Sequence, residues 1–206
     1  MTTPDITLYA SVASRSFTAR WMLEELGVPY QVRVVDIRNG EQKSPDYLRL
    51  NPMGKVPTLT DGDLVVTETT AICLYLADRY GYGTLAPKVD DAGRAAYLRW
   101  AVFSTAVLEP AYQTKSLELP AFRHGWGDLD SALHTVGQAL TPGPWLLGET
   151  FTAADVALGA ALTVGLFTKQ IPDNPALGAY NQRLAARPAY QSASAATWPP
   201  ELFNAG

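Results

Sequence analysis

The chain has 206 residues, 47% of them hydrophobic and 17% charged, with a formal net charge of −4 at pH 7. This composition supports a buried core and excludes a disordered chain, and the lack of a basic run argues against nucleic acid or an anionic membrane as partner. The single cysteine, Cys73, excludes an intrachain disulfide and indicates a reducing compartment. We therefore expect a cytoplasmic protein without a secretory leader or membrane-spanning segment.

The first 80 residues show alternating strand and helix patterns. Residues 5–10 alternate as a strand with Ile6 and Leu8 on one face, and the helical stripe that follows ends at Gly27. Residues 30–37 form the next strand pattern, which the intervening helix predicts to be parallel to the first. The remaining patterns are a helical turn over 44–50, a hairpin at Asp61-Gly62 and a mostly apolar helix over 68–80. The order β-α-β-α-β-β-α is thioredoxin-like.

Helical patterns dominate the rest of the chain. Residues 81–90 are rich in turn formers and are predicted to be a linker. The helical patterns then cover roughly 91–115, 120–140, 153–170, 175–186 and 188–195. We predict a thioredoxin-like α/β domain over 1–80 and an all-helical domain over 91–206. Within the second domain, Thr152 to Asp155 fits a capping box, with Phe151 as its hydrophobic staple.

The stretch "NPMGKVPTL" places Pro57 at the first position of a strand, where proline is tolerated. A peptide bond that precedes proline adopts the cis form at modest cost. A cis bond here would leave the N–H and C=O of Val56 free to pair with an extended peptide ligand. The alternative is an ordinary trans proline in a turn.

Glu68 and Thr69 stand at the start of the apolar helix. Free N–H groups and the helix dipole favour an anion there, so Thr69 suits a ligand carboxylate and Glu68 suits an ammonium group. Together they form a candidate site for an amino-acid head group. A plain helix cap remains the alternative.

These features resemble the cytosolic glutathione transferases over nearly the whole chain. The resemblance rests on the Pro57 loop, the helix start before "AICLYLADRY", and the later stretches "FTAADVAL" and "YNQRLAARPAYQ". It implies a homodimer that takes glutathione as co-substrate, needs no metal, and holds a small hydrophobic electrophile in the helical domain. It also implies that Val56 pairs with the cysteinyl backbone and that Glu68 and Thr69 hold the γ-glutamyl end. Lys55 is either a contact to the glycine carboxylate or a solvated surface lysine.

The resemblance also assigns a role to "LYASVASRSF", residues 8 to 17. A thiol with a pKa of about 8.5 is mostly protonated at neutral pH, and a hydroxyl donor near a helix N-terminus favours the reactive thiolate. The serine-type classes place this donor thirteen residues before the glycine that ends the helix, which here is Ser14. The tyrosine-type classes place it at Tyr9. We favour Ser14, because it lies where the helix begins, with Arg15 as an electrostatic aid; helix capping remains an alternative.

Some positions depart from the family pattern or carry simpler interpretations. The delta class has histidine in place of Gly54 and arginine in place of Thr70, which implies weaker glutathione binding. Arg15 occupies the position of the beta-class cysteine, which argues against disulfide chemistry. Ser16 is interpreted as a helix cap, and Ser11 as a loop hydroxyl.

The remaining candidates have structural explanations. Cys73 lies in the middle of an apolar helix and is predicted to be a core residue, and His124 and His134 have no metal-ligand spacing. Three aromatic residues of the first long helix are candidates for either the electrophile pocket or the core: Trp100, Phe103 and Tyr112.

The combined prediction is a glutathione transferase that ionises glutathione for attack on an apolar electrophile, a detoxification reaction. Two alternatives use the same fold. The first is a glutathione-dependent isomerase, peroxidase or dehalogenase, and the second is a non-catalytic glutathione-binding or scaffold protein.

Overall fold

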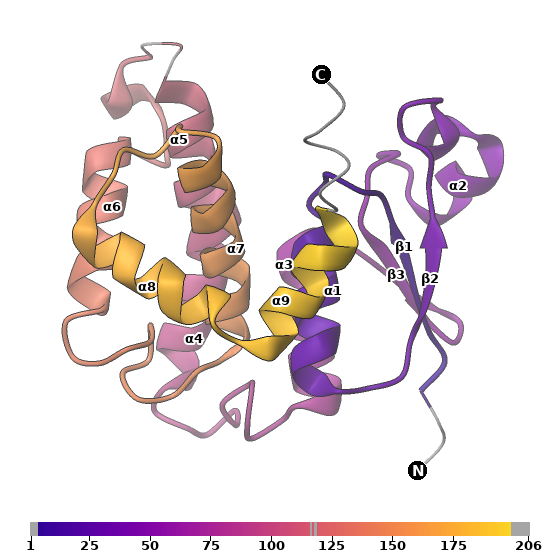
Figure 1. Ribbon diagram of the computed structural model, residues 1–206, viewed down its shortest axis with the longest axis horizontal. Coiled ribbons are helices and arrows are strands. Elements are labelled where there is room, and N and C mark those ends of the chain that lie inside the picture. Colours follow the sequence, from indigo (N-terminus) through magenta and orange to yellow (C-terminus); the bar gives the residue numbers. More distant parts are fainter. Residues whose placement is uncertain (1–3, 116, 118, 199–206) are drawn as a thin grey trace. The chain divides into compact units, whose positions relative to one another are not determined.

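A computed structural model describes residues 4–115, 117 and 119–198, which divide into two compact units (Figure 1). The first unit contains the chain up to Tyr80 together with helix α9 (Pro188–Thr197), and the second contains residues 81–187. Unlike the expected helical domain of residues 91–206, the second unit therefore ends before the last helix.

The first unit is built on a four-stranded sheet of order β2-β1-β3-β4. Its strands are β1 (Ile6–Ala10), β2 (Gln31–Val34), β3 (Thr58–Asp61) and β4 (Leu64–Thr67). Strands β1 and β2 are parallel, as predicted from the helix between them, and the other pairs are antiparallel. Gly62 adopts a φ of +56° in the turn between β3 and β4, which confirms the predicted hairpin.

Helices cover both faces of this sheet (Figure 1). They are α1 (Ser16–Leu26), the short 3-10 turn η1 (Glu41–Lys43), α2 (Pro45–Leu50) and α3 (Thr69–Tyr80). Gly27 ends α1 in the left-handed conformation, with its N–H directed to the carbonyls of Leu23 and Glu24. Ile6 and Leu8 point into the core, so the predicted order of elements and the buried face of β1 are both confirmed.

Helix α9 belongs to the first unit because its aromatic side chain packs against those of α1. The ring of Tyr190 meets the ring of Phe17 edge-on at 5.1 Å and that of Trp21 at 5.0 Å. Phe17 and Trp21 are both at most 1% exposed, so this cluster is part of the core. Helical periodicity indicates which face of α9 is apolar but not which partner covers it.

The second unit is helical. Its elements are α4 (Arg94–Phe103), the π turn η2 (Ser104–Leu108), α5 (Glu109–Lys115), the 3-10 turn η3 (Ala121–Arg123), α6 (Leu129–Ala139), α7 (Ala153–Phe167) and α8 (Pro175–Ala185). The predicted helix over 91–115 is one continuous run that contains the π turn. The predicted helix over 120–140 is wrong in its first half, because Gly127 takes a φ of +71° and Asp128 caps α6 by accepting from the Ser131 N–H.

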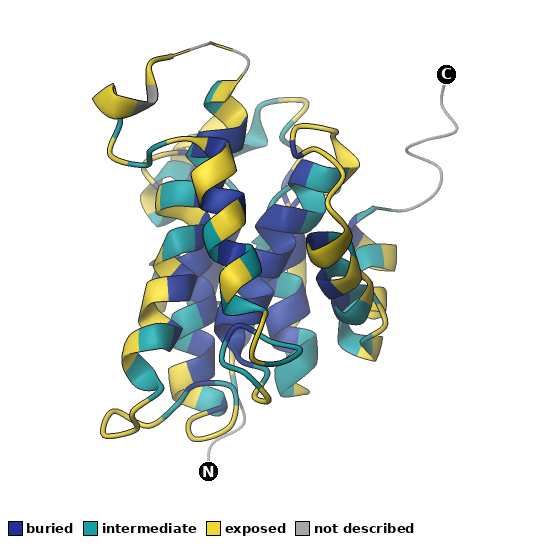
Figure 2. Ribbon diagram, turned by 90° about the vertical axis from the view of Figure 1, so that its left-hand side faces the viewer, coloured by how far each residue is buried: buried dark blue, intermediate teal, exposed yellow. Residues whose placement is uncertain are grey.

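Buried residues gather on the inner faces of these helices, and exposed ones lie on the outer faces (Figure 2). Helix α7 begins with the predicted capping box, in which the Asp155 carboxylate accepts from the Thr152 N–H and Thr152 Oγ1 accepts from the Ala154 N–H. The buried carboxylate of Asp155 also accepts from the Leu146 N–H and the Tyr180 hydroxyl. No helix in the described part of the chain is long and apolar enough to cross a membrane.

Candidate active site

The predicted site residues of the first unit meet at one end of its sheet. The register pairs Tyr9 of β1 with Thr58 of β3, and Thr58 with Thr67 of β4. Because β3 runs antiparallel to both neighbours, the loop after β1, the loop before β3 and the helix start after β4 lie side by side. The parallel strand β2 ends at the same side, where the Val35 N–H donates to the carbonyl of Ala10.

This arrangement has the dimensions of a short peptide. Neighbouring strands lie about 4.8 Å apart, so the span from β1 across β3 to β4 is about 10 Å. Three extended residues span about 10 Å as well. The sheet end therefore offers a row of sites along which an extended tripeptide can lie.

The middle of this row is the loop before β3. The Val56–Pro57 peptide bond is cis, as the sequence motif suggested. Within the described residues, the N–H and C=O of Val56 have no hydrogen-bond partner. The residue before Val56 fixes the loop: the Lys55 carbonyl accepts from the Tyr47 hydroxyl at 2.7 Å and from Asn51 Nδ2 at 3.0 Å. A rigid loop with a free donor and acceptor is suited to strand-like pairing with a ligand.

Lys43 is a candidate cation at this site that sequence analysis missed. Its Nζ donates to the Met53 carbonyl at 2.9 Å and lies 2.7 Å from the position of a Cβ added to Gly54. Gly54 also has a φ of +57°, so the backbone itself disfavours a side chain there. The ammonium group of Lys43 thus fills the space that a histidine side chain at position 54 would need. Lys55, the predicted cation, is exposed beside it.

The β4 end of the row carries a strained residue. Glu68 has a φ of +67°, in the left-handed region that a non-glycine residue enters at a cost of about 1 kcal/mol. Its carbonyl accepts from the Ile72 N–H at 2.9 Å, so the strain is maintained by the first turn of α3. The Glu68 side chain is exposed, and Thr69, the first residue of α3, is half-buried.

The β1 end carries the serine loop. Ala13 is also left-handed, with a φ of +49°, and its N–H donates to the Thr197 carbonyl of α9 at 2.8 Å. Ser14 follows, and its Oγ accepts from the Ser16 N–H at 3.1 Å, while the N-cap position of α1 is Arg15 and Ser16 is the first residue of the helix. The predicted cap at Ser16 is therefore wrong. Strain at both ends of the row is typical of a functional site.

Tyr9 and Ser14 are directed to different surroundings. Successive side chains of a strand point to opposite faces, and Leu8 and Ala10 face the core under α1. Tyr9 lies on the other face, where its ring meets that of Tyr47 from α2 edge-on at 6.1 Å. The Arg33 guanidinium lies 5.6 Å from the centre of the Tyr9 ring. The structure thus groups Tyr9 with α2, and Ser14 with the N-terminus of α1.

Arg15 is the residue before α1 and lies within electrostatic range of Cys73 in α3. Burial raises the pKa of the Cys73 thiol to about 12, and the positive charge of Arg15 partly offsets that rise. A fully buried thiol with this pKa stays protonated and inert, which confirms Cys73 as a core residue. The charge of Arg15 therefore acts on α3 as well as at the start of α1.

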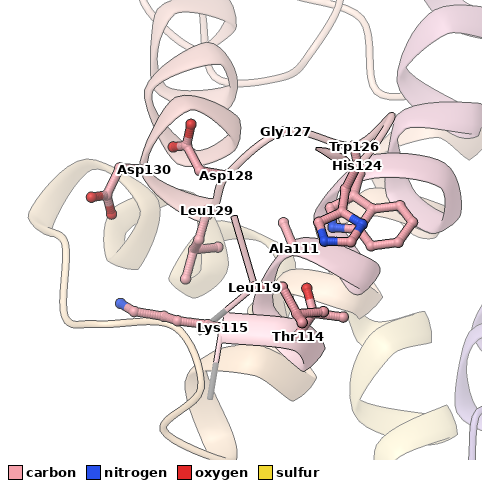
Figure 3. Close-up of a pocket in the computed structure, with 10 residues that line it drawn as sticks. All are labelled: Ala111, Thr114, Lys115, Leu119, His124, Trp126, Gly127, Asp128, Leu129 and Asp130. Carbon is pink, nitrogen blue, oxygen red and sulfur yellow. The ribbon is translucent and has the colours of Figure 1, made fainter. Parts of the chain in front are cut away.

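The helical unit contains a separate cavity of about 170 Å³ (Figure 3). Its walls come from the end of α5, the following loop and the start of α6, and include the stacked rings of His124 and Trp126. None of the predicted glutathione contacts lies there. In the described residues no three histidine, cysteine, aspartate or glutamate side chains cluster as metal ligands.

The aromatic residues proposed for an electrophile pocket are largely internal. Trp100 is 4% exposed and Tyr112 is 3% exposed, which agrees with the core alternative. Phe103 is half-buried against the Trp100 ring, and Tyr112 also borders a shallow hollow of about 450 Å³ with Lys115 and Lys169.

Comparison with known proteins identifies the family of this chain. Residues 4–78 match the family model described as glutathione S-transferase, N-terminal domain. Glutathione S-transferase 3 of Zea mays is 31% identical over 193 residues, which is 85% of this chain and 86% of that protein. The chain belongs to the glutathione S-transferase family.

Two further comparisons describe how far the similarity extends. Glutathione S-transferase hmp2 of Hypomyces subiculosus is 45% identical over 87 residues, but the match spans only 42% of this chain and 41% of that protein. The theta class glutathione S-transferase of Xanthomonas axonopodis pv. citri, solved with glutathione bound, superposes with a TM-score of 0.70 and 32% identity. That superposition covers 92% of this chain and 97% of the other.

Proposed function

We propose that the protein is a glutathione transferase that binds glutathione along the sheet end and ionises its thiol for attack on a small hydrophobic electrophile. The observation that carries this proposal is the register row Tyr9–Thr58–Thr67, which aligns three loops with ligand-binding chemistry over about the length of a tripeptide. The glutathione bound to the Xanthomonas relative supports the same ligand.

Each part of glutathione has a matching group. The unpaired N–H and C=O of Val56 pair with the cysteinyl backbone. Glu68 accepts the α-ammonium group of the γ-glutamyl end, while Thr69 and the N-terminus of α3 bind its carboxylate. Lys43 and Lys55 bind the glycine carboxylate, which compensates for the absence of a side chain at position 54.

The cysteinyl sulfur then faces the loop after β1. The hydroxyl of Ser14 donates to the thiolate, and the charge of Arg15 and the α1 dipole stabilise it further. The thiol proton leaves to solvent, the sulfur forms a bond with the electrophilic carbon, and the leaving group departs with its electron pair. Orientation and anion stabilisation supply the rate enhancement, and no metal takes part.

The ionisation of bound glutathione tests this function directly. Ultraviolet difference spectra against pH give the thiolate fraction for the wild type, Ser14→Ala and Tyr9→Phe. We expect the bound thiol of the wild type to titrate well below the free value of about 8.5. Ser14→Ala should return it toward that value, and Tyr9→Phe should leave it unchanged. Binding without ionisation would instead support a glutathione carrier.

A homodimer in the cytoplasm completes the proposal. Two apolar side chains of the edge strand β4 are exposed, namely Leu64 at 53% and Val65 at 45%, and Met53 in the loop before β3 is 65% exposed. Apolar exposure of this extent is typical of an interface, and we assign it to a second copy of the chain. Sedimentation of Leu64→Glu tests this assignment, since it should shift the protein to a monomer. The control is Val34→Glu, on the opposite sheet edge and 69% exposed, which should stay dimeric.

A further inference from the structure

The loop between β1 and α1 contains a cluster of hydroxyl and backbone groups around Ser14. Ser14 Oγ lies 2.7 Å from the Ser11 carbonyl oxygen and 2.9 Å from Ser16 Oγ, and donates to either. It has a single proton, so it serves one of these two acceptors at a time. In the protein without ligand, the proposed donor to glutathione is therefore engaged by its own loop.

Ser16 has one hydroxyl proton, and the acceptor within its reach is Ser14 Oγ. Its Oγ accepts from the Ser11 N–H at 3.2 Å and from the Ser14 hydroxyl at 2.9 Å. When Ser14 gives its proton to the Ser11 carbonyl, Ser14 Oγ accepts the Ser16 hydroxyl proton across the same 2.9 Å. Ser16 is 1% exposed, so water does not readily supply another acceptor. A buried donor without a partner is unfavourable, so the favoured arrangement is the one in which Ser16 donates to Ser14 and Ser14 donates to the Ser11 carbonyl.

Ser14 Oγ remains the acceptor for the Ser16 hydroxyl when Ser14 turns its proton toward a ligand. We propose that Ser16 is a positioning residue for Ser14: when the Ser14 proton moves from the loop to the glutathione sulfur, the Ser16 hydroxyl donates to Ser14 Oγ. The inference rests on the proposed function, because it requires a thiolate as the new acceptor. No bond to carbon is made or broken, each hydroxyl keeps its proton, and only the Ser14 proton changes its acceptor.

The consequence is a stronger donor at Ser14. Its oxygen then accepts from both the N–H and the O–H of Ser16 while its proton points to sulfur. Hydrogen bonds in such a chain polarise one another, and the anion at the end is stabilised. Removing the Ser16 hydroxyl should therefore reduce the thiolate fraction at a pH below the titration midpoint about three- to tenfold, as expected for one hydrogen bond.

Ser11 supplies the matched control. It belongs to the same loop, but it takes part in the cluster through its backbone N–H and C=O. We expect Ser16→Ala to lower the thiolate fraction of bound glutathione and Ser11→Ala to leave it unchanged. In a Ser14→Ala background, Ser16→Ala should have no further effect. Binding of S-methylglutathione, which has no thiol to ionise, should be the same in all variants.

The double-mutant cycle separates this inference from the proposed function. If Ser14→Ala suppresses ionisation but Ser16→Ala does not, or acts equally in both backgrounds, the role of Ser16 is refuted and the proposed function stands. If Ser14→Ala leaves the ionisation unchanged, both the donor assignment and this inference fail. Weaker binding of S-methylglutathione by Ser16→Ala would also refute the inference, because it would indicate a general loop-holding role.

Two conservative variants complete the test. Ser16→Thr keeps the hydroxyl and should restore the wild-type ionisation. If Ser16→Ala does not fold, Ser16→Cys replaces it, because a thiol fills nearly the same volume but donates weakly. Its readout is the pH dependence of kcat with 1-chloro-2,4-dinitrobenzene, whose acid limb should move to higher pH. A profile equal to that of the wild type would contradict the role of Ser16.

Discussion

The ammonium nitrogen of Lys43 lies 2.7 Å from the position that a Cβ of residue 54 would occupy, so Lys43 and a side chain at position 54 exclude each other. Gly54 accepts this neighbour without strain at a φ of +57°. The consequence is that a cation stands beside the Val56 loop although the residue in the loop is glycine. This pairing links η1 to the loop before β3 and leads to a test of the glycine subsite.

We expect Lys43→Met to weaken glutathione binding about 5- to 20-fold, the loss of one charged hydrogen bond. Titration calorimetry measures the affinity, and Lys88→Met on the exposed surface of the second unit serves as the control. Glutathione ethyl ester, in which the glycine carboxylate is blocked, should bind wild type and Lys43→Met equally. An equal loss for both ligands would assign Lys43 to the loop structure instead.

Substitutions of Glu68 should change glutathione affinity and the free energy of unfolding independently. Glu68→Gly removes both the carboxylate and the strain of the left-handed φ, so glutathione affinity should fall more than tenfold. The free energy of unfolding should stay the same or rise by up to about 1 kcal/mol. Glu68→Ala loses the same carboxylate and keeps the strain, so it should be the less stable of the two. Urea unfolding and calorimetry on both variants decide the point, and an unstable Glu68→Gly contradicts it.

Asp61 gives the first unit a pH-dependent stability. Its Oδ2 accepts from the Tyr75 hydroxyl at 2.7 Å and from the Tyr80 hydroxyl at 2.6 Å. Burial, and then the bond to Asp61, raises the pKa of Tyr75 to about 12 and also raises the pKa of Tyr80. Unfolded tyrosines titrate near about 10, so the folded state holds these protons more tightly.

The resulting stabilisation is complete below about pH 10 and is lost as the pH rises from there toward the folded values. Urea unfolding at about pH 8, 10 and 11 should therefore show decreasing stability. Asp61→Asn should lower the free energy of unfolding at neutral pH by about 1–3 kcal/mol and weaken the alkaline dependence. If the free energy of unfolding of Asp61→Asn falls with alkaline pH as steeply as that of the wild type, groups other than Tyr75 and Tyr80 cause the pH dependence.

Asp155 should dominate the stability of the second unit. Its carboxylate is buried and accepts from two backbone N–H groups and the Tyr180 hydroxyl. An asparagine amide presents an N–H₂ group to some of these donors, so Asp155→Asn should cost about 2–4 kcal/mol and lower Tm by roughly 4–15 °C. The control Asp128→Asn keeps an equally good cap on the exposed start of α6. If Asp155→Asn and Asp128→Asn melt at similar temperatures, Asp155 does not dominate the stability of the second unit.

The sequence by itself determined the local structure of the first unit. Alternation in β1, the stop at Gly27, the turn at Asp61-Gly62 and the apolar helix before Tyr80 all depend on neighbours within a few residues. The capping box at Thr152 is equally local, and it formed as predicted. The same local patterns located the motifs at Val56 and Glu68, because each motif lies at a predicted boundary between two elements.

Only the tertiary structure decided which distant residues meet. Lys43 and Gly54 are separated by a helix, and no periodic pattern links them. Helix α9 joined the first unit because Tyr190 packs against the rings of α1. The sequence left Tyr9 and Ser14 as alternatives, and the two face different sides because the strand pleat turns Tyr9 toward α2. Such contacts depend on the register of the sheet and on packing, which local propensities do not encode.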